Sequence, residues 1–176
     1  MPSSLDAIMQ SVEHSPSHAR KVVDNMIAPH TRIVLFQGPP GCGKSTLARE
    51  IAEILGDKSI IVSADHTFES ESYSRERVGY AHTQCQQAAK DALKEGKIVL
   101  VDNTNIKANH AQPYLDMVDS SLRRTVTVVL LCPRNDMEAH KCAERGIHAP
   151  AEYSMKAYRE MERIPKLPCL TLYPRF

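Results

Sequence analysis

Short runs of apolar and β-branched residues recur along the chain after Thr31, and longer stretches with helical spacing separate them. The runs lie at residues 32–36, 59–63, 97–101, 125–131 and 170–173. Because each run is apolar at consecutive positions, both of its faces are expected to be covered, which is typical of strands in a parallel sheet. The intervening stretches predict helices at about 44–55, 74–95, 109–120, 135–145 and 151–162. This alternation predicts an α/β fold, a three-layer sandwich in which helices cover both faces of a five-stranded parallel sheet.

The first thirty residues also carry apolar positions at helical spacing, interrupted at Ser15-Pro16. We expect two short helices there, forming an N-terminal helical extension (1–30) that packs on the main body. Residues 31–176 then form the main domain. A chain of 176 residues with 42% hydrophobic content can bury one full core but is too short for two ordinary domains.

The first predicted strand leads directly into GPPGCGKST, which matches G-x-x-x-x-G-K-[ST] between a strand and a helix. Glycines at 41 and 43 allow the backbone to turn its N–H groups around a polyanion. Lys44 is expected to reach the outer phosphates of ATP, and Ser45 to offer its hydroxyl to Mg²⁺. A glycine-rich turn that only joins strand to helix is the alternative. The candidate ATP-binding residues are Gly38, Pro39, Pro40, Gly41, Cys42, Gly43, Lys44, Ser45 and Thr46.

Two carboxylates follow predicted strands at the edge of the sheet where ligands bind in open α/β folds. Asp102 follows the run 97–101 and is the candidate second partner of Mg²⁺, with a helix or turn cap as the alternative. Asp65 follows the run 59–63. It is the candidate catalytic base that accepts the proton of an attacking hydroxyl, with a cap of the following turn as the alternative.

Residues 134–163, between the fourth and fifth predicted strands, combine two charged helical stretches around Gly146 and predict a helical lid. A lid that closes a guanidinium onto a transferring phosphoryl group stabilises its negative charge and excludes water. Arg145 is the first candidate for this catalytic role. Arg134 and Arg163 are second candidates, and for each the alternative is an ordinary solvated or ion-paired residue.

The amino-acid composition narrows the class of protein further. A formal net charge of +1 with 24% charged residues indicates neither a disordered chain nor a strongly basic coat protein, so any contact with nucleic acid has to be local. The five cysteines are scattered, without zinc-site spacing, and we expect reduced thiols. No apolar run approaches the roughly 20 residues of a membrane span, and the polar start MPSSLDAIMQ lacks the charged-then-apolar pattern expected of a secretion signal. We expect a soluble protein of the cytoplasm or nucleus that does not contact membranes.

Taken together, these motifs resemble the phosphate-loop kinases of the polynucleotide 5′-hydroxyl kinase type, most closely a eukaryotic branch similar to the kinase-like domain of NEDD4-binding protein 2. The resemblance covers roughly residues 31 to 165. It rests on GPPGCGKSTLAR, VSADH, AHTQC, VDNTNIK and the lid run ERGIHA with its trailing YREME. It implies a P-loop NTPase fold in which Lys44 and Ser45 hold ATP and magnesium, Asp65 takes the acceptor's proton and Arg145 supports the phosphoryl group.

The resemblance also implies that the acceptor is the 5′-hydroxyl end of DNA or RNA. Phage and repair-type kinases carry an arginine three positions after the base aspartate, whereas this chain has Phe68. Arg75, Arg77 and His82 are the candidates to replace that acceptor contact.

Three functions are compatible with the sequence. A kinase acting on a polynucleotide 5′ end predicts an open basic groove between the helix at 74–95 and the lid. A small-molecule kinase, acting on a nucleoside or a sugar, predicts a closed acceptor pocket. A nucleotide-binding module would switch a partner without turnover, although Lys44, Ser45, Asp65, Asp102 and Arg145 are all present.

Overall fold

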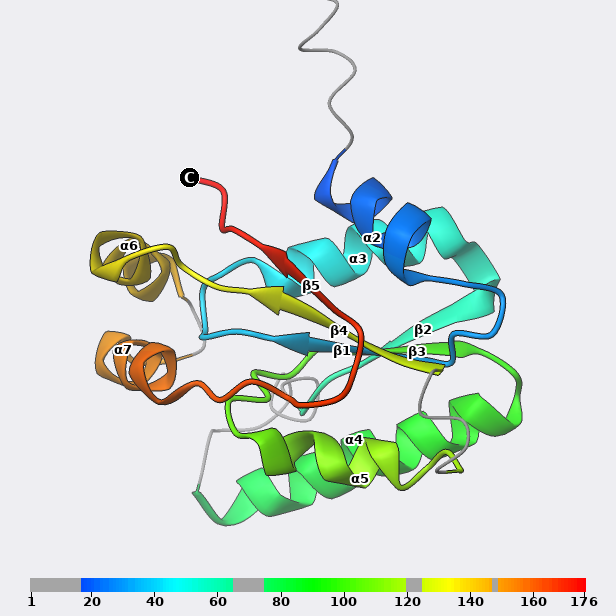
Figure 1. Ribbon diagram of the computed structural model, residues 1–176. Helices are drawn as coiled ribbons and strands as arrows, with labels where there is room; N and C mark the ends of the chain where they lie inside the picture. The colour runs from blue at the N-terminus through cyan, green and yellow to red at the C-terminus, as the bar shows by residue number, and fades with distance from the viewer. Residues whose placement is uncertain (1–16, 65–74, 120–124, 147–148) are drawn as a thin grey trace, which may run out of the picture.

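The computed structural model describes residues 17–64, 75–119, 125–146 and 149–176. Within them, five parallel strands form one sheet in the order β2-β3-β1-β4-β5 (Figure 1). β1 lies at the centre, where Ile33 pairs with both Val99 and Val126. The predicted α/β class and five-stranded parallel sheet are confirmed. The strands are β1 (Ile33–Gln37), β2 (Ser59–Val62), β3 (Ile98–Val101), β4 (Val126–Leu131) and β5 (Cys169–Leu172).

Helices cover both faces of this sheet, as predicted. α2 (His18–Met26) and α3 (Lys44–Leu55) pack on one face, and α4 (Arg75–Lys94) and α5 (Gln112–Leu115) on the other (Figure 1). α6 (Asp136–Arg145) and α7 (Ala151–Glu160) pack against each other beyond the carboxyl ends of the strands. Two 3₁₀ turns, η1 (Gly56–Lys58) and η3 (Ala108–Ala111), complete the described elements. The predicted lid therefore forms a helical pair at the edge of the sheet.

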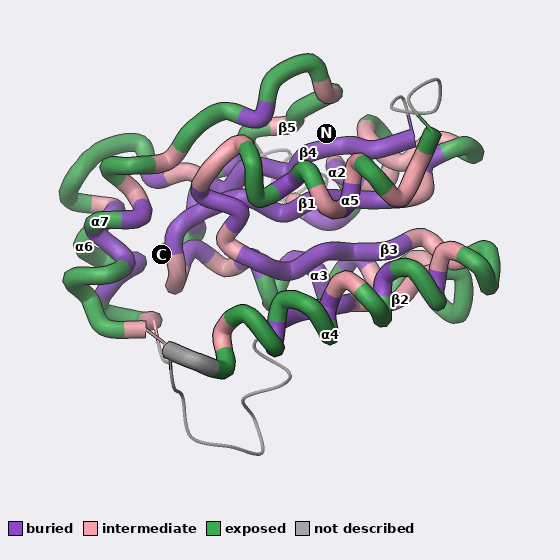
Figure 2. The backbone as a smooth tube through the Cα atoms, turned by 90° about the horizontal axis from the view of Figure 1, so that it is seen from below, coloured by how far each residue is buried: buried purple, intermediate pink, exposed green. Residues whose placement is uncertain are grey.

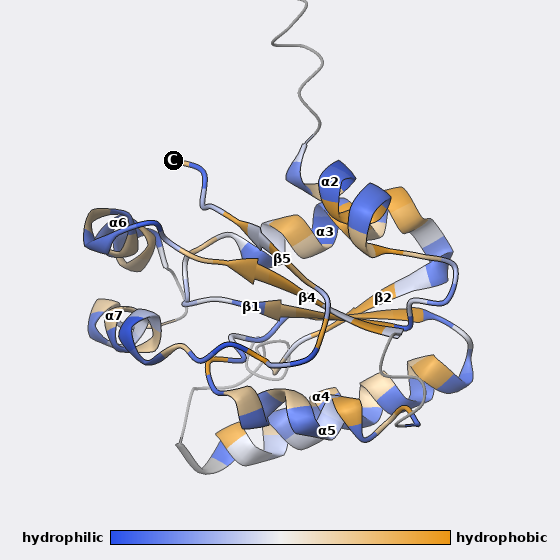
Figure 3. Ribbon diagram, viewed as in Figure 1, coloured by the Kyte–Doolittle hydropathy of each residue, from blue (hydrophilic) through white to orange (hydrophobic). Residues whose placement is uncertain are grey.

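Successive side chains along each strand point to opposite faces of the sheet, and this divides the hydrophobic core into two clusters. Val34 and Phe36 face α2 and α3, whereas Ile33 and Leu35 face α4 and α5, and all four side chains are fully buried. Figure 2 shows the central strands β1, β3 and β4 buried between helices whose outer sides are exposed, whereas the edge strands β2 and β5 are only partly buried. Figure 3 shows the same separation as hydropathy. Burial on both faces explains why the central strands read as unbroken apolar runs in the sequence.

The predicted helix at 109–120 is wrong in its extent. The chain forms the η3 turn and then α5, which ends at Leu115. Pro113 stands in the first turn of α5, and since proline has no N–H and restricts the residue before it, one continuous helix cannot run through this position. After Leu115, Met117 and Val118 make tight i→i+3 bonds to Tyr114 and Leu115 instead.

The N-terminal extension falls partly outside the described residues, because the first of its two predicted helices lies in residues 1–16. The second is α2. Its Ala19 and Val22 belong to the same buried cluster as the α3 residues Leu47 and Ile51. A separate extension and main domain stay a prediction, but α2 shares the core of the sheet.

Candidate functional site

The loop at residues 38–43 joins the end of β1 to the start of α3 at the centre of the sheet. Gly41 and Gly43 adopt φ values of 81° and 93°, a left-handed backbone that disfavours a side chain. Gly43 caps α3 without a side-chain hydrogen bond, and the first turn of α3 holds no acidic residue. The positive end of the α3 dipole therefore faces the loop, and no acidic side chain of the first turn offsets it.

Three successive carbonyl groups of the loop accept hydrogen bonds from side chains. Lys44 Nζ donates to Pro39 O at 3.0 Å. Ser154 Oγ, from α7, donates to Pro40 O at 2.7 Å. Arg145 Nε, from the end of α6, donates to Gly41 O at 2.6 Å. The loop carbonyls are thus turned towards Lys44 and the lid.

This orientation fixes where the loop amides point. The described peptide bonds are all trans, so each N–H lies opposite the carbonyl oxygen of the same peptide. The N–H groups of Gly41 and Cys42 accordingly point away from Ser154 and Arg145, and neither has an acceptor among the described residues. Unpaired amides beside an uncapped helix start are the chemistry of an anion-binding site.

The loop also packs directly against the lid. A β-carbon on Gly41 would stand 1.9 Å from the carbonyl oxygen of Cys142, in α6. The thiols of Cys42 and Cys142 are buried together, and their hydrogen bond, with burial, raises the pKa of Cys42. The Cys42 thiol is thus protonated at neutral pH, which agrees with a packing position in the loop.

The side chains expected to hold ATP and Mg²⁺ lie around this loop. Lys44 is buried, at 7% exposure, and its ammonium folds back over the loop. Ser45 and Thr46 are exposed on the first turn of α3. Asp102 follows β3 and is 7% exposed, and its carboxylate makes no hydrogen bond or ion pair with a described residue. Oxygen donors of this kind fit a hard cation such as Mg²⁺.

Hydrogen bonds hold the segment after β3 against both neighbouring strands. Asp102 N donates to Val62 O at 2.9 Å, and Gly38 N donates to Thr104 O at 3.0 Å. The segment that carries Asp102 therefore runs beside the start of the phosphate loop.

Asn103 is a buried residue that the sequence analysis did not identify. Its Oδ1 accepts from Ala64 N at 2.9 Å, and its Nδ2 donates to Tyr114 Oη at 3.2 Å. Burial, followed by a hydrogen bond with Cys85, raises the pKa of Tyr114, so its hydroxyl remains protonated. Asp65 itself lies outside the described residues, as do His66 and Phe68. Asn103 fixes the backbone of the residue immediately before Asp65.

Gln37 links β1 to the end of the lid and was also missed. Its Nε2 donates to Asn105 O at 2.9 Å and to Glu162 O at 2.6 Å, while Asn105 Nδ2 donates to Phe36 O at 2.8 Å. Asn105 adopts a positive φ of 47°. The sequence offered two signals for these residues: Gln37 is a polar residue at the end of an apolar run, and Asn103 and Asn105 follow the third run. Neither signal indicates which residue each side chain bonds.

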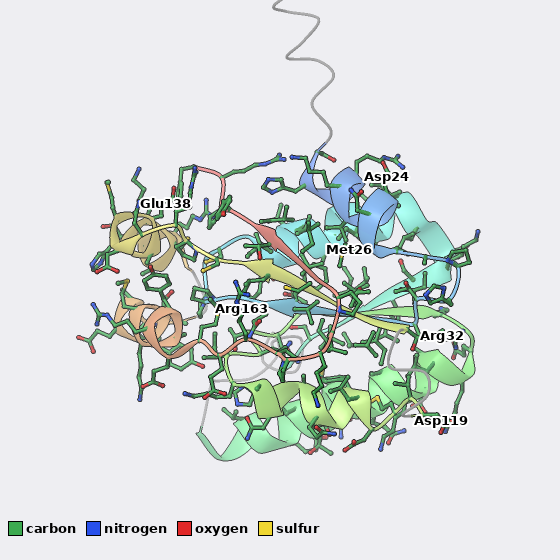
Figure 4. All side chains as sticks on the ribbon, viewed as in Figure 1. Asp24, Met26, Arg32, Asp119, Glu138 and Arg163 are labelled. Carbon is green, nitrogen blue, oxygen red and sulfur yellow. The ribbon has the colours of Figure 1, made fainter. Side chains whose placement is uncertain are left out.

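The three lid arginines differ in their contacts. Arg145 bonds Gly41 O and Arg175 O, and its guanidinium stacks on Phe176 with 4.8 Å to the ring centre. Its predicted contact with the phosphoryl group stays a prediction. Arg134 pairs with Glu138 at 2.9 Å, as expected of an ordinary ion pair. Figure 4 shows Glu138 on α6 and Arg163 near the carboxyl ends of the strands.

A cavity of about 390 Å³ lies where β1, β4 and β5 end. Its polar lining comes mainly from Gln37, Arg134, Glu162, Arg163 and Thr171.

Of the candidate acceptor contacts, Arg77 and His82 lie on α4, while the side chain of Arg75 is outside the described residues. Burial and then the charge of nearby His82 lower the pKa of His110, which lies in η3.

Two wider properties concern the described residues only. In the ranges 17–64, 75–119, 125–146 and 149–176, no three His, Cys, Asp or Glu side chains gather as metal ligands. Over the same ranges, no helix combines the length and apolar character needed to cross a bilayer.

Sequence comparison finds relatives for part of the chain. It is 29% identical over 116 residues to a Lon protease of Aquifex aeolicus, covering 61% of this chain and 14% of the protease. It is 37% identical over 73 residues to an adenylate kinase of Thermosipho melanesiensis, covering 42% of this chain and 30% of that kinase. The matched part of the chain thus spans less than a third of the length of either relative.

Structure comparison finds matches over most of the chain. A gluconokinase from Sinorhizobium meliloti 1021 aligns with a TM-score of 0.57 at 14% identity, covering 84% of this chain and 85% of that one. A chain of the Pnkp1/Rnl/Hen1 RNA repair complex aligns with a TM-score of 0.55 at 18% identity, covering 78% and 46%. At these identities the likeness establishes the fold.

A family model described as an AAA domain (AAA_33) matches residues 33–164, from the first residue of β1 to the end of the lid. This range includes the phosphate loop, Asp102 and both lid helices. Because the match covers well over half of the sequence, the chain belongs to this AAA domain family, and it is a P-loop domain with a kinase-like fold.

Proposed function

We propose that this protein is an ATP-dependent kinase that transfers the γ-phosphoryl group to the 5′-hydroxyl end of a polynucleotide. The observation that carries the proposal is the set of hydrogen-bond donors gathered at one point of the fold. The N–H groups of Gly41 and Cys42, the start of α3 and the buried ammonium of Lys44, which donates to Pro39 O, meet where β1 ends. A polyphosphate is the ligand whose charge and acceptor oxygens match such a set.

The surrounding residues then have distinct tasks. Lys44 and the loop amides hold the phosphates, and Ser45 and Asp102 are the residues that would hold Mg²⁺. When bound, Mg²⁺ supplies charge neutralisation to the phosphates. Asp65 accepts the proton of the attacking hydroxyl, and the hydrogen bond from Ala64 N to Asn103 Oδ1 fixes the backbone that leads to it. Arg145, already bound to the loop through Gly41 O, supports the phosphoryl group.

The polynucleotide acceptor is supported by the combined motifs VSADH, AHTQC and VDNTNIK, with the lid run ERGIHA. The fold likeness to a chain of an RNA repair complex is compatible with it. With a net charge of +1, contacts with the polynucleotide would be few and confined to its end.

A second candidate is a small-molecule kinase acting on a nucleoside or a sugar. The cavity of about 390 Å³ favours it, because this volume is within the range of small-ligand pockets and Arg134 and Arg163 line it. The gluconokinase that shares the fold is named for a small-molecule acceptor. The third possibility, a nucleotide-binding module without turnover, is separated from both by an activity assay.

The deciding experiment offers ATP labelled at the γ-phosphate together with 5′-hydroxyl DNA and RNA oligonucleotides, nucleosides and sugars. We expect label on the oligonucleotide ends and none on 5′-phosphorylated controls. Label on a nucleoside or sugar alone would replace the polynucleotide acceptor by a small molecule. Tight nucleotide binding with no labelled acceptor would point to the non-catalytic module.

A further inference from the structure

Ser154 is a buried lid residue whose only described side-chain hydrogen bond reaches the phosphate loop. It lies in α7, its side chain is among the buried polar groups at 2% exposure, and its Oγ donates to Pro40 O at 2.7 Å. A buried hydroxyl normally has a partner, and here the partner is a loop carbonyl more than a hundred residues away in the sequence.

Ser154 bonds the Pro40–Gly41 peptide, and the Gly41 N–H of this peptide is the first N–H of the loop that is available to a ligand. Gly38 N already donates to Thr104 O, and neither Pro39 nor Pro40 has an N–H. The next N–H is that of Gly41, in the peptide whose carbonyl is Pro40 O. Since this peptide is planar and trans, a hydrogen bond that fixes the carbonyl also fixes the opposite direction of the Gly41 N–H.

Arg145 has the same relation to the next peptide, because its Nε bonds Gly41 O and the Cys42 N–H lies opposite. The two lid helices therefore each fix one successive peptide of the loop. Glycine at 41 has no side chain to restrict this peptide, so the orientation depends on the hydrogen bonds from outside the loop.

We propose that Ser154 is a positioning residue for phosphate binding: its hydroxyl holds the Pro40–Gly41 peptide so that the Gly41 N–H faces a bound phosphate. The inference rests on the proposed nucleotide binding at this loop. If Ser154 has this role, the affinity of the loop for phosphate depends on α7. The Ser154 hydroxyl does not itself donate to the phosphate, because it donates to Pro40 O.

The test compares the dissociation constants of ADP and of inorganic pyrophosphate for wild type, Ser154→Ala and Ser59→Ala by calorimetric titration. Ser59 is the matched control, because its Oγ also donates to a backbone carbonyl, that of Gly56, at 3.2 Å, away from the loop. For Ser154→Ala we expect binding of both ligands to weaken by the same factor of about ten, since a freed peptide no longer presents its donor. Ser59→Ala should bind as wild type.

A purely structural role for Ser154 would lower the melting temperature and leave both dissociation constants unchanged in the folded protein, and this result would overturn the proposal. Loss of ADP affinity without loss of pyrophosphate affinity would overturn it as well, because the effect would then not concern phosphate. If Ser154→Ala does not fold, Ser154→Cys, with a weaker donor of similar size, should show a smaller loss for both ligands, and wild-type affinity there would count against the proposal. Wild type that binds neither ligand would refute nucleotide binding itself.

Discussion

Lys44 combines burial with a charge, which is costly unless the charge has partners. Its ammonium is held by Pro39 O at the loop, at 3.0 Å, so the protein positions the charge before any ligand arrives. Carbonyl groups pair with an ammonium less strongly than phosphate oxygens do. The Lys44 ammonium is therefore placed so that a bound phosphate can replace Pro39 O as its partner.

Substitution Lys44→Ala should weaken ATP binding by roughly tenfold or more and should also lower turnover, because the ammonium meets phosphates in both the ground and transition states. Titration with ATP and a steady-state kinase assay measure the two effects. Lys58→Ala, an exposed lysine in the η1 turn, is the control. Unaltered ATP binding by Lys44→Ala would contradict the role of this loop.

The role of Asp65 as catalytic base is predicted from the sequence alone. The structure describes the preceding residue, Ala64, and Asn103, which bonds the backbone of Ala64. Asp65→Asn should leave ATP affinity nearly unchanged and reduce turnover by roughly a hundredfold or more, since the amide cannot accept the acceptor's proton. Equilibrium binding and single-turnover kinetics separate the two. Wild-type turnover in this variant would remove Asp65 from the mechanism, and Asp57→Asn serves as the control.

At the scale of elements, backbone atoms of the phosphate loop and of α6 lie in direct contact, and side chains of both lid helices add hydrogen bonds to the loop. Gly41 lies so close to Cys142 O that no β-carbon fits, and Ser154 and Arg145 add hydrogen bonds from both lid helices. The lid helices and the loop therefore form one packed unit in this structure.

Gly41→Ala should separate this unit. The new methyl group would meet the backbone of Cys142 at 1.9 Å, and the φ of 81° strains any side chain, so we expect a loss of about 2 kcal/mol or more of unfolding free energy. Denaturant unfolding measures the loss, and hydrogen exchange should show faster exchange in α6. Gly79→Ala is the control, because a β-carbon there meets nothing within 4 Å in α4. Equal stability of the two variants would show that the loop and α6 do not pack this closely.

At the scale of the molecule, the core extends beyond the matched family range to include α2. Val22 is fully buried, and the cluster it joins contains residues of β1, β3, β4 and α3. α2 therefore contributes to the stability of the sheet that carries the phosphate loop.

Val22→Ala should lower the free energy of unfolding by about 2 kcal/mol, from the loss of two buried methyl groups and the cavity left behind. Asp24→Ala, on the exposed side of α2, should change it by less than about 0.5 kcal/mol. Chemical denaturation monitored by circular dichroism compares the two. A Val22→Ala protein as stable as wild type would show that α2 is not part of the cooperative core.

The sequence by itself determined the strands, most of the helices and the phosphate loop. Strands buried on both faces appear as continuous apolar runs, and the loop is a contiguous motif whose glycines, lysine and serine lie within a few positions. The exception was the helix expected at 109–120, where the hydrophobic spacing spans a 3₁₀ turn and a short helix that begins beside Pro113 and ends at Leu115.

Only the tertiary structure decided which residues support that loop. Ser154 bonds Pro40, Gln37 bonds Asn105 and Glu162, and Asn103 bonds Ala64, across separations of 39 to 125 residues. Each of these side chains is a common polar residue whose local sequence would suit a solvated position as well. Their partners follow from the strand order and from the packing of the lid, because hydrogen bonds between distant segments depend on how the chain folds back on itself rather than on neighbouring residues.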